Sequence, residues 1–270
     1  MKTRILAAAV LLPLLLVIVL VLPEIFTAVF FGLAAAFGAY ELLWNTGLVK
    51  EKRLVAYTAV VAFSVAIWSH FDAVYSAALV GVFVFTAVLL AELLISKAQL
   101  QFEKIAICLV GGILVPFMLT ALVRIHNGDH GRVFILIPFA IAFLSDTGAY
   151  FAGCYLGKHK LAPRISPKKT VEGMLGGIVA AMAGMELFCL VLTLFGYQVN
   201  YLYAVIYGFV GAVAAVFGDL CFSAIKRQTG IKDYGNLIPG HGGVLDRLDS
   251  MTVVAPLAEV LLLLLPVAVK

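Results

Sequence analysis

Long apolar runs, each ended by proline, glycine or a cluster of charges, fill most of this 270-residue chain. A run of about 20 apolar residues is long enough to cross the hydrocarbon core of a bilayer as a helix. The runs are continuous rather than alternating, which excludes the strands of a membrane barrel. Nine spanning helices are predicted, at about residues 4–22, 25–44, 54–69, 73–95, 104–125, 133–153, 171–195, 201–225 and 250–269. The count falls to eight if residues 54–95 fold differently.

Composition and charge place this chain among membrane proteins. Hydrophobic residues make up 63% of it and charged residues 13%, against about 25% charged in soluble domains. Lys and Arg prefer cytoplasmic loops. With a cytoplasmic N-terminus, nine spans put all 19 basic residues on that side except Arg124, Arg132 and Lys270. The expected fold is all-α, a polytopic transmembrane helical bundle of about nine spans in the cell (inner) membrane, with its N-terminus and active site facing the cytoplasm.

No polar stretch is long enough to form a separate soluble domain. We expect a single integral membrane domain over residues 1–270, with N-terminal spans in 1–132 and catalytic spans and cytoplasmic loops in 133–270. The four dispersed cysteines indicate reduced core residues, and no nucleic-acid partner is expected. The spacing of Gly173 and Gly177 indicates close helix packing, within the chain in preference to a seam between copies.

Asp219 stands inside the apolar run that begins near Tyr201. A carboxylate there costs about 2.5–3.5 kcal/mol on insertion scales, so a partner or water must compensate it. On a helix, Ser223 and Lys226 follow at i+4 and i+7 and therefore share its face. The alternative is a structural pair of Asp and Lys that holds two helices together.

Two further acids, Asp246 and Asp249, are spaced i, i+3 at the start of the last span. On one helix their carboxylates would point to one side and converge with Asp219. Three clustered carboxylates repel unless a cation holds them, and Mg²⁺ binds through one or two carboxylates plus substrate phosphates. The alternative is that the pair caps a helix N-terminus, which leaves Asp219 unexplained.

The loop between these acids combines glycines with cations. Gly240, Gly242 and Gly243 allow backbone N–H groups to approach an anion. Four bases lie in or beside the loop, where they can donate to phosphate oxygens: Lys226, Arg227, Lys232 and Arg247. Together these features indicate a phosphate site.

A second polar cluster lies on the sixth predicted span and the loop that follows it. Ser145 and Asp146 indicate a buried polar cavity rather than a lipid-facing surface. In the loop, Lys168 and Lys169 can bind a polyphosphate, and either Thr170 or Ser166 can cap the next helix. The alternative is a basic loop that only sets membrane topology.

The remaining acids within apolar runs carry less weight. Glu41, Glu92, Glu186 and Glu259 are expected near span ends or paired inside the bundle. The external loop at residues 126–130 resembles a metal patch in composition only, and a solvated loop is favoured there.

A signature over residues 223–249 resembles that of the phosphatidate cytidylyltransferases, also called CDP-diacylglycerol synthases. It runs Ser-x-Ile-Lys-Arg, then Lys-Asp-x-Gly, then Ile-Pro-x-His-Gly-Gly-Val-x-Asp-Arg-Leu-Asp. Residues 145–150 and 166–173 also resemble family blocks, whereas the first five spans resemble the family only in length and hydropathy. The resemblance implies transfer of the cytidylyl group of CTP to phosphatidic acid, giving CDP-diacylglycerol and pyrophosphate. It also implies Mg²⁺ and often K⁺ as cofactors, membrane lipids as partners, and assembly into a homodimer.

The residue chemistry and the resemblance together assign three sets of candidate residues. The catalytic set is Asp219, Ser223, Lys226, Arg227, Asp246 and Arg247. The substrate-binding set is Ser145, Asp146, Lys168, Lys169, Thr170, Lys232, Asp233, His241, Gly242 and Gly243. The metal-binding set is Asp219, Asp246 and Asp249.

Two other functions would also explain these acidic and basic residues. An enzyme that uses CTP on another lipid, such as a polyprenol kinase or an archaeal-type lipid cytidylyltransferase, would need similar cations. A secondary transporter also buries acids, at the interface of two repeated halves. This chain shows no corresponding halves, and its acids cluster at one cytoplasmic end, which disfavours a transporter.

Overall fold

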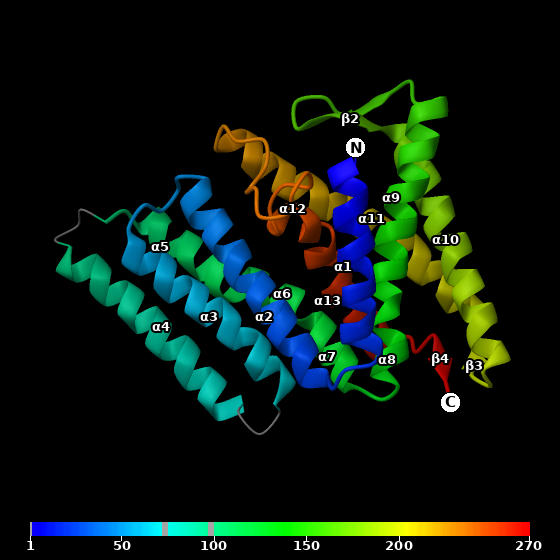
Figure 1. Cartoon of the computed structure of the whole chain (residues 1–270), viewed down its shortest axis with the longest axis horizontal. Helices are drawn as coiled ribbons and strands as arrows, with labels where there is room; N and C mark the ends of the chain where they lie inside the picture. Colours follow the sequence, from blue (N-terminus) through cyan, green and yellow to red (C-terminus); the bar gives the residue numbers. More distant parts are fainter. Residues whose placement is uncertain (1, 72–74, 97–99) are drawn as a thin grey trace. The chain divides into compact units, whose positions relative to one another are not determined.

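A computed structural model describes residues 2–71, 75–96 and 100–270 (Figure 1). The chain forms two compact units, one of residues 1–132 with 226–248 and one of residues 133–225 with 249–270. Helices dominate both units, which confirms the predicted all-α class. The chain passes from the second unit to the first within α11 (Tyr201–Gln228) and returns directly after α12 (Leu245–Leu248).

The first unit is a set of helices. In order these are α1 (Lys2–Leu20), α2 (Glu24–Tyr40), η1 (Glu41–Asn45), α3 (Lys52–His70), α4 (Tyr75–Ile95), α5 (Phe102–Leu109), η3 (Val110–Leu114), α6 (Val115–Leu119), α7 (Ala121–Asn127), the start of α8 (Gly131–Phe134), and α12. The segments η1 and η3 are single π-helical turns, a feature often found at functional sites.

Small residues bring α2 and α3 together, and these two helices run side by side (Figure 1). A Cβ added at Gly32 would lie 3.0 Å from the Phe63 ring and 3.2 Å from Ala66 Cβ. The ring of Phe31 and the side chain of Ala62 are fully buried. This contact packs the middle of α2 against α3.

The second unit consists of long helices and two short strand pairs. Its elements are α9 (Leu136–Leu156), β1 (Lys160–Ala162), β2 (Ser166–Thr170), α10 (Val171–Leu194), β3 (Gln198–Val199), most of α11, α13 (Met251–Leu264) and β4 (Ala268–Val269). β1 and β2 form an antiparallel hairpin, and β3 pairs antiparallel with β4. The sequence pattern did not predict these strands, because segments of two to five residues leave no periodic signal.

Close contact between α9 and α10 depends on glycine. A Cβ added at Gly173 would lie 2.9 Å from Ala149 O, and one at Gly177 would lie 2.7 Å from Ser145 O. Both glycines of the predicted small-residue pair therefore face α9 within the same chain. The prediction of packing within the chain is confirmed for these two positions.

Gly177→Leu is expected to lower the midpoint of thermal unfolding in detergent, with a loss of about 1–3 kcal/mol, because overpacking forces the helices apart. Ala183→Leu, at an exposed position of α10, is the matched control and should unfold near the wild-type temperature. Equal shifts in the two variants would contradict this account of the α9–α10 contact.

Seven helical stretches among the described residues are long and apolar enough to cross a membrane. They are Glu24–Asn45, Lys52–His70, Ser76–Ile95, Phe102–Asn127, Gly131–Leu156, Val171–Leu194 and Tyr201–Gln228. The other two predicted spans correspond to α1 and α13. The prediction of one helix over 250–269 is wrong at its end, because α13 stops at Leu264 before Pro266 and residues 268–269 form β4. Nine spans stays a prediction.

Candidate active site

The signature loop begins where α11 ends. The backbone N–H of Ile231 donates to Lys226 O over 2.9 Å, and Gly230 has a φ of +74°. Glycine adopts this left-handed conformation without a steric cost, as is common directly after a helix. Arg227 Nη1 donates to Ile231 O over 3.3 Å, so the Arg227 guanidinium lies against the first turn of the loop.

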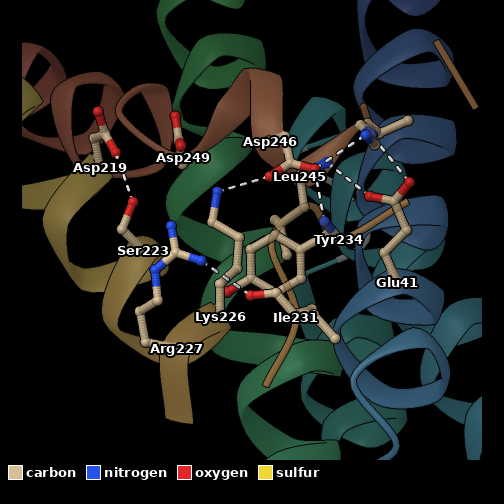
Figure 2. Close-up of polar contacts among 12 residues, drawn as sticks. Glu41, Asp219, Ser223, Lys226, Arg227, Ile231, Tyr234, Leu245, Asp246 and Asp249 are labelled. Atoms are coloured by element: carbon tan, nitrogen blue, oxygen red, sulfur yellow. Dashed lines mark hydrogen bonds and ion pairs between the residues drawn. The ribbon is translucent and has the colours of Figure 1, made fainter. Parts of the chain in front are cut away.

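Asp246, on α12, is the centre of the polar contacts in the first unit (Figure 2). Its Oδ1 accepts from Lys226 Nζ over 2.7 Å. Its Oδ2 accepts from the backbone N–H groups of Tyr234 and Gly243, over 2.7 and 3.0 Å. The Asp246 side chain is 2% exposed and the Lys226 side chain 10% exposed. This buried ion pair therefore closes the loop by joining α11, Tyr234 and Gly243 to α12.

A tight turn lies at the tip of the loop. Gly240 and Gly242 have φ angles of +77° and +91°, which L side chains rarely adopt. The N–H of Ile238 donates to Gly242 O, and the N–H of His241 donates to Ile238 O. A Cβ at Gly242 would also lie 3.1 Å from Asp246 Oδ2. Glycine at 242 thus satisfies both the turn and the close approach to the buried carboxylate.

A polar pocket of about 510 Å³ opens on this loop. Its lining residues are Lys232, Asp233, Asn236, Ile238, Gly240, His241, Gly242 and Arg247. Lys232 and Arg247 are exposed at its surface, and the buried Nδ1 of His241 has no hydrogen-bond partner among the described residues. Two cations beside glycine backbone suit a phosphate-bearing ligand.

Two side chains outside the predicted sets also hold this loop. Glu41 accepts from the N–H groups of Val244 and Leu245, and Asn45 Nδ2 donates to Tyr234 O. The only sequence signal was an acid inside an apolar run, which requires compensation. Nothing in the sequence indicated that this compensation would come from a loop about 200 residues further along the chain.

Asp219, in the second unit, has a different environment. Ser223 Oγ donates to its Oδ1 over 3.0 Å, and Lys169 Nζ lies 2.5 Å from its Oδ2. Its side chain is 29% exposed. The predicted shared helix face of Asp219 and Ser223 is thereby confirmed. Lys169, predicted to bind substrate, reaches Asp219 from the end of β2 and carries the charge that compensates it.

The other predicted residues of the second unit take several positions. Thr170 Oγ1 accepts from Gly173 N over 3.1 Å and caps α10, as predicted. Lys168 is exposed beside Lys169, and Ser145 is buried against α10. Asp146 was expected to be buried but is exposed on α9, because the next position along the helix turns away from the α10 contact that buries Ser145.

Asp249 does not continue the helix of Asp246. α12 ends at Leu248 and α13 begins at Met251, so the assumption of one helix over both acids is wrong. Asp249 Oδ1 accepts from Ser250 N, and a Cβ at Gly218 would lie 2.8 Å from Asp249 O. The residue before Asp219 therefore packs on the backbone of Asp249 in the second unit.

The three predicted metal ligands differ in availability. Each oxygen of Asp246 accepts a hydrogen bond in a buried setting, whereas the oxygens of Asp219 contact Ser223 and Lys169 on a side chain that is partly exposed. Asp219 and Asp249 lie in the same unit, so they are the two carboxylates that would hold Mg²⁺ together with substrate phosphates, and Mg²⁺ itself stays a prediction. The described residues contain no group of three or more His, Cys, Asp or Glu side chains placed to hold a metal. Since Asp246 belongs to the other unit, convergence of all three acids stays a prediction.

Several known proteins with sequences similar to this chain are named phosphatidate cytidylyltransferases. A phosphatidate cytidylyltransferase of Bacillus subtilis is 38% identical over 177 residues, 65% of each chain. That of Staphylococcus haemolyticus is 37% identical over 179 residues, 65% of this chain and 66% of its own. That of Staphylococcus epidermidis is 38% identical over 186 residues, 68% of each. The matched segments thus span about two thirds of the length of these relatives.

A family profile covers much more of the chain. Residues 2–265 match the profile described as "Cytidylyltransferase family". This range contains the signature loop, the hairpin of β1 and β2, and the buried pair of Lys226 and Asp246. The chain therefore belongs to the cytidylyltransferase family.

Proposed function

We propose that this protein transfers the cytidylyl group of CTP to phosphatidic acid, as a nucleotidyltransferase of phospholipid biosynthesis. A phosphatidate oxygen forms a bond to the α-phosphorus of CTP, and the bond from that phosphorus to the β-phosphate oxygen breaks. The products are CDP-diacylglycerol and pyrophosphate. The phosphate of phosphatidic acid is already an anionic nucleophile, so the reaction needs no general base on the protein.

The observation that carries this proposal is the polar pocket on the signature loop of an otherwise apolar chain. Two anions must approach each other in this reaction, and positioned cations offset their repulsion. Lys232 and Arg247 line the pocket and are exposed to a ligand. The names of the relatives indicate phosphatidic acid as the substrate, and the pocket contains hydrogen-bond donors suited to the triphosphate of CTP.

Magnesium belongs to the proposal as a cofactor. Asp219 and Asp249 would hold it, and when bound it neutralises charge on the phosphates. Lys169 pairs with Asp219 and supplies positive charge beside it. Lys226 and Asp246 keep the loop closed. K⁺ is carried over from the family resemblance alone.

The arrangement in the cell is also proposed. Seven apolar helices among the described residues support an integral membrane protein, and the charge bias of the sequence supports nine spans with a cytoplasmic N-terminus. We place the protein in the inner membrane, with its active site toward the cytoplasm where CTP is made. A homodimer is proposed from the resemblance.

Purified protein in detergent, given phosphatidic acid, labelled CTP and Mg²⁺, is expected to form CDP-diacylglycerol. Arg247→Ala should raise the KM for CTP by about 10- to 100-fold, because a hydrogen bond to a charged group contributes about 1.5–3 kcal/mol. Lys160→Ala, which removes an exposed cation of β1 outside the pocket, should retain the wild-type KM.

The same assay separates the alternatives. A wild-type protein that is inert with phosphatidic acid but labels a polyprenol would be an enzyme of a different lipid. A protein that needs an ion gradient and leaves CTP intact would be a transporter. Equal KM values for CTP in Arg247→Ala and Lys160→Ala would show that the pocket does not bind the nucleotide.

A further inference from the structure

Glu41 is a buried acid at the end of α2, far from the signature in sequence. It is 3% exposed and lies at the first position of the π-helical turn η1. Its Oε1 accepts from Val244 N over 3.0 Å, and its Oε2 accepts from Leu245 N over 2.8 Å (Figure 2). Both carboxylate oxygens are thus used on two consecutive backbone N–H groups at the start of α12.

Asn45, at the last position of η1, holds the other end of the same loop. Its Nδ2 donates to Tyr234 O over 2.7 Å. Two side chains from one π-helical turn therefore contact the backbone on both sides of residues 235–243. These residues contribute most of the pocket lining, and the remaining lining residues flank them.

The loop is shaped around the Glu41 carboxylate. A Cβ added at Gly235 or at Gly243 would collide with it. Leu245 also packs against α2, since a Cβ at Gly38 would lie 3.5 Å from Leu245 Cδ1. Glycine at both loop positions allows the backbone to close on the acid, and this contact satisfies a charge that would be costly inside an apolar helix.

We propose that Glu41 is a positioning residue for cytidylyl transfer, acting through the backbone of Val244 and Leu245. Val244 O accepts from Arg247 N over 3.0 Å, so the turn that Glu41 holds also carries a pocket cation. Glu41 thereby sets where Arg247 and the glycine turn meet the nucleotide. The part of this inference that concerns CTP rests on the proposed function.

Glu41→Gln tests the inference with almost no change in shape. The amide presents an N–H₂ group where one oxygen accepted, so one backbone N–H loses its acceptor. A lost capping bond of about 0.5–2 kcal/mol corresponds to a KM for CTP raised by about twofold to 30-fold. The KM for phosphatidic acid should stay within about twofold of wild type. Hydrogen exchange of the Val244 and Leu245 amides should accelerate by a similar factor.

Glu92→Gln is the matched control. Glu92 is also largely buried and pairs with Arg53 in the same unit, away from the loop. It should alter neither KM nor loop exchange. Asn45→Ala provides a second variant should Glu41→Gln fold poorly, and it should accelerate exchange at the upstream end of the loop and raise the KM for CTP.

The outcomes separate positioning from general structural support. If Glu41→Gln lowers kcat at unchanged KM for both substrates, with loop exchange like that of Glu92→Gln, Glu41 only supports folding and the proposal is overturned. If the wild type fails to use CTP and phosphatidic acid, the proposed function fails by itself. Loop exchange in Glu41→Gln then still decides whether Glu41 holds the loop.

Discussion

Asp246→Asn is expected to lower cytidylyl transfer by at least about 100-fold. The Asp246 carboxylate accepts from Lys226 Nζ and from two backbone N–H groups while only 2% exposed. An amide at this position must turn an N–H₂ group toward at least one of these donors, and it leaves the Lys226 charge unpaired. Breaking a buried ion pair costs about 3–5 kcal/mol. Each 1.4 kcal/mol by which this loss destabilises the active form of the loop lowers the rate about tenfold.

The measurement is CDP-diacylglycerol formation at saturating CTP, together with thermal unfolding of the same sample. A double-mutant cycle with Lys226→Met isolates the pair. Removing both charges should destabilise the protein by less than the sum of the single changes, because neither charge is then left buried alone. Strictly additive losses, or an Asp246→Asn enzyme with near wild-type turnover, would show that the pair does not hold the loop in its active form.

Asp219→Asn is expected to lower turnover by about 100-fold at a fixed Mg²⁺ concentration while leaving thermal stability nearly unchanged. Asp219 is partly exposed, at 29% of its side chain, so removing its charge costs little folding energy. The proposed Mg²⁺ ligand loses its negative charge, and the remaining acid, Asp249, must hold the ion alone. The Mg²⁺ concentration for half-maximal activity should therefore rise by about tenfold or more.

Ser223→Ala is the matched control for this prediction. It removes the hydroxyl that donates to Asp219 Oδ1 but leaves the carboxylate charge in place. A titration of activity against Mg²⁺ should shift far less in Ser223→Ala than in Asp219→Asn. An Asp219→Asn enzyme with the wild-type Mg²⁺ curve would exclude Asp219 as a metal ligand and leave it as the partner of Lys169.

Much of the fold was predictable because helices in a membrane protein carry a strong local signal. An apolar run of sufficient length determines where a span lies with little help from its neighbours. The end of the chain was not predictable in this way. Residues 268–269 are apolar but form β4 against β3, and this pairing depends on a strand about 70 residues earlier rather than on the run itself.

The structural part of the site prediction was confirmed where contacts are local. Asp219 and Ser223 share a helix face and are hydrogen-bonded, and Thr170 caps α10, because both relations follow from helix geometry. It failed for Asp249, since the break between α12 and α13 separates it from the helix of Asp246. A break of only two residues between helices hardly changes the pattern of apolar and charged positions, so the sequence does not predict it.

The sequence by itself determined that this chain is an all-helical membrane protein of the cytidylyltransferase type, because apolar run length and a dense signature are properties of local order along the chain. Only the tertiary structure decided which charges meet. It placed residues 226–248 with the first 132 residues, paired Lys226 with Asp246, and brought Glu41 to the N–H groups of Val244 and Leu245. The reason is that a buried charge must find a partner. Which of several partners it finds depends on how distant helices pack.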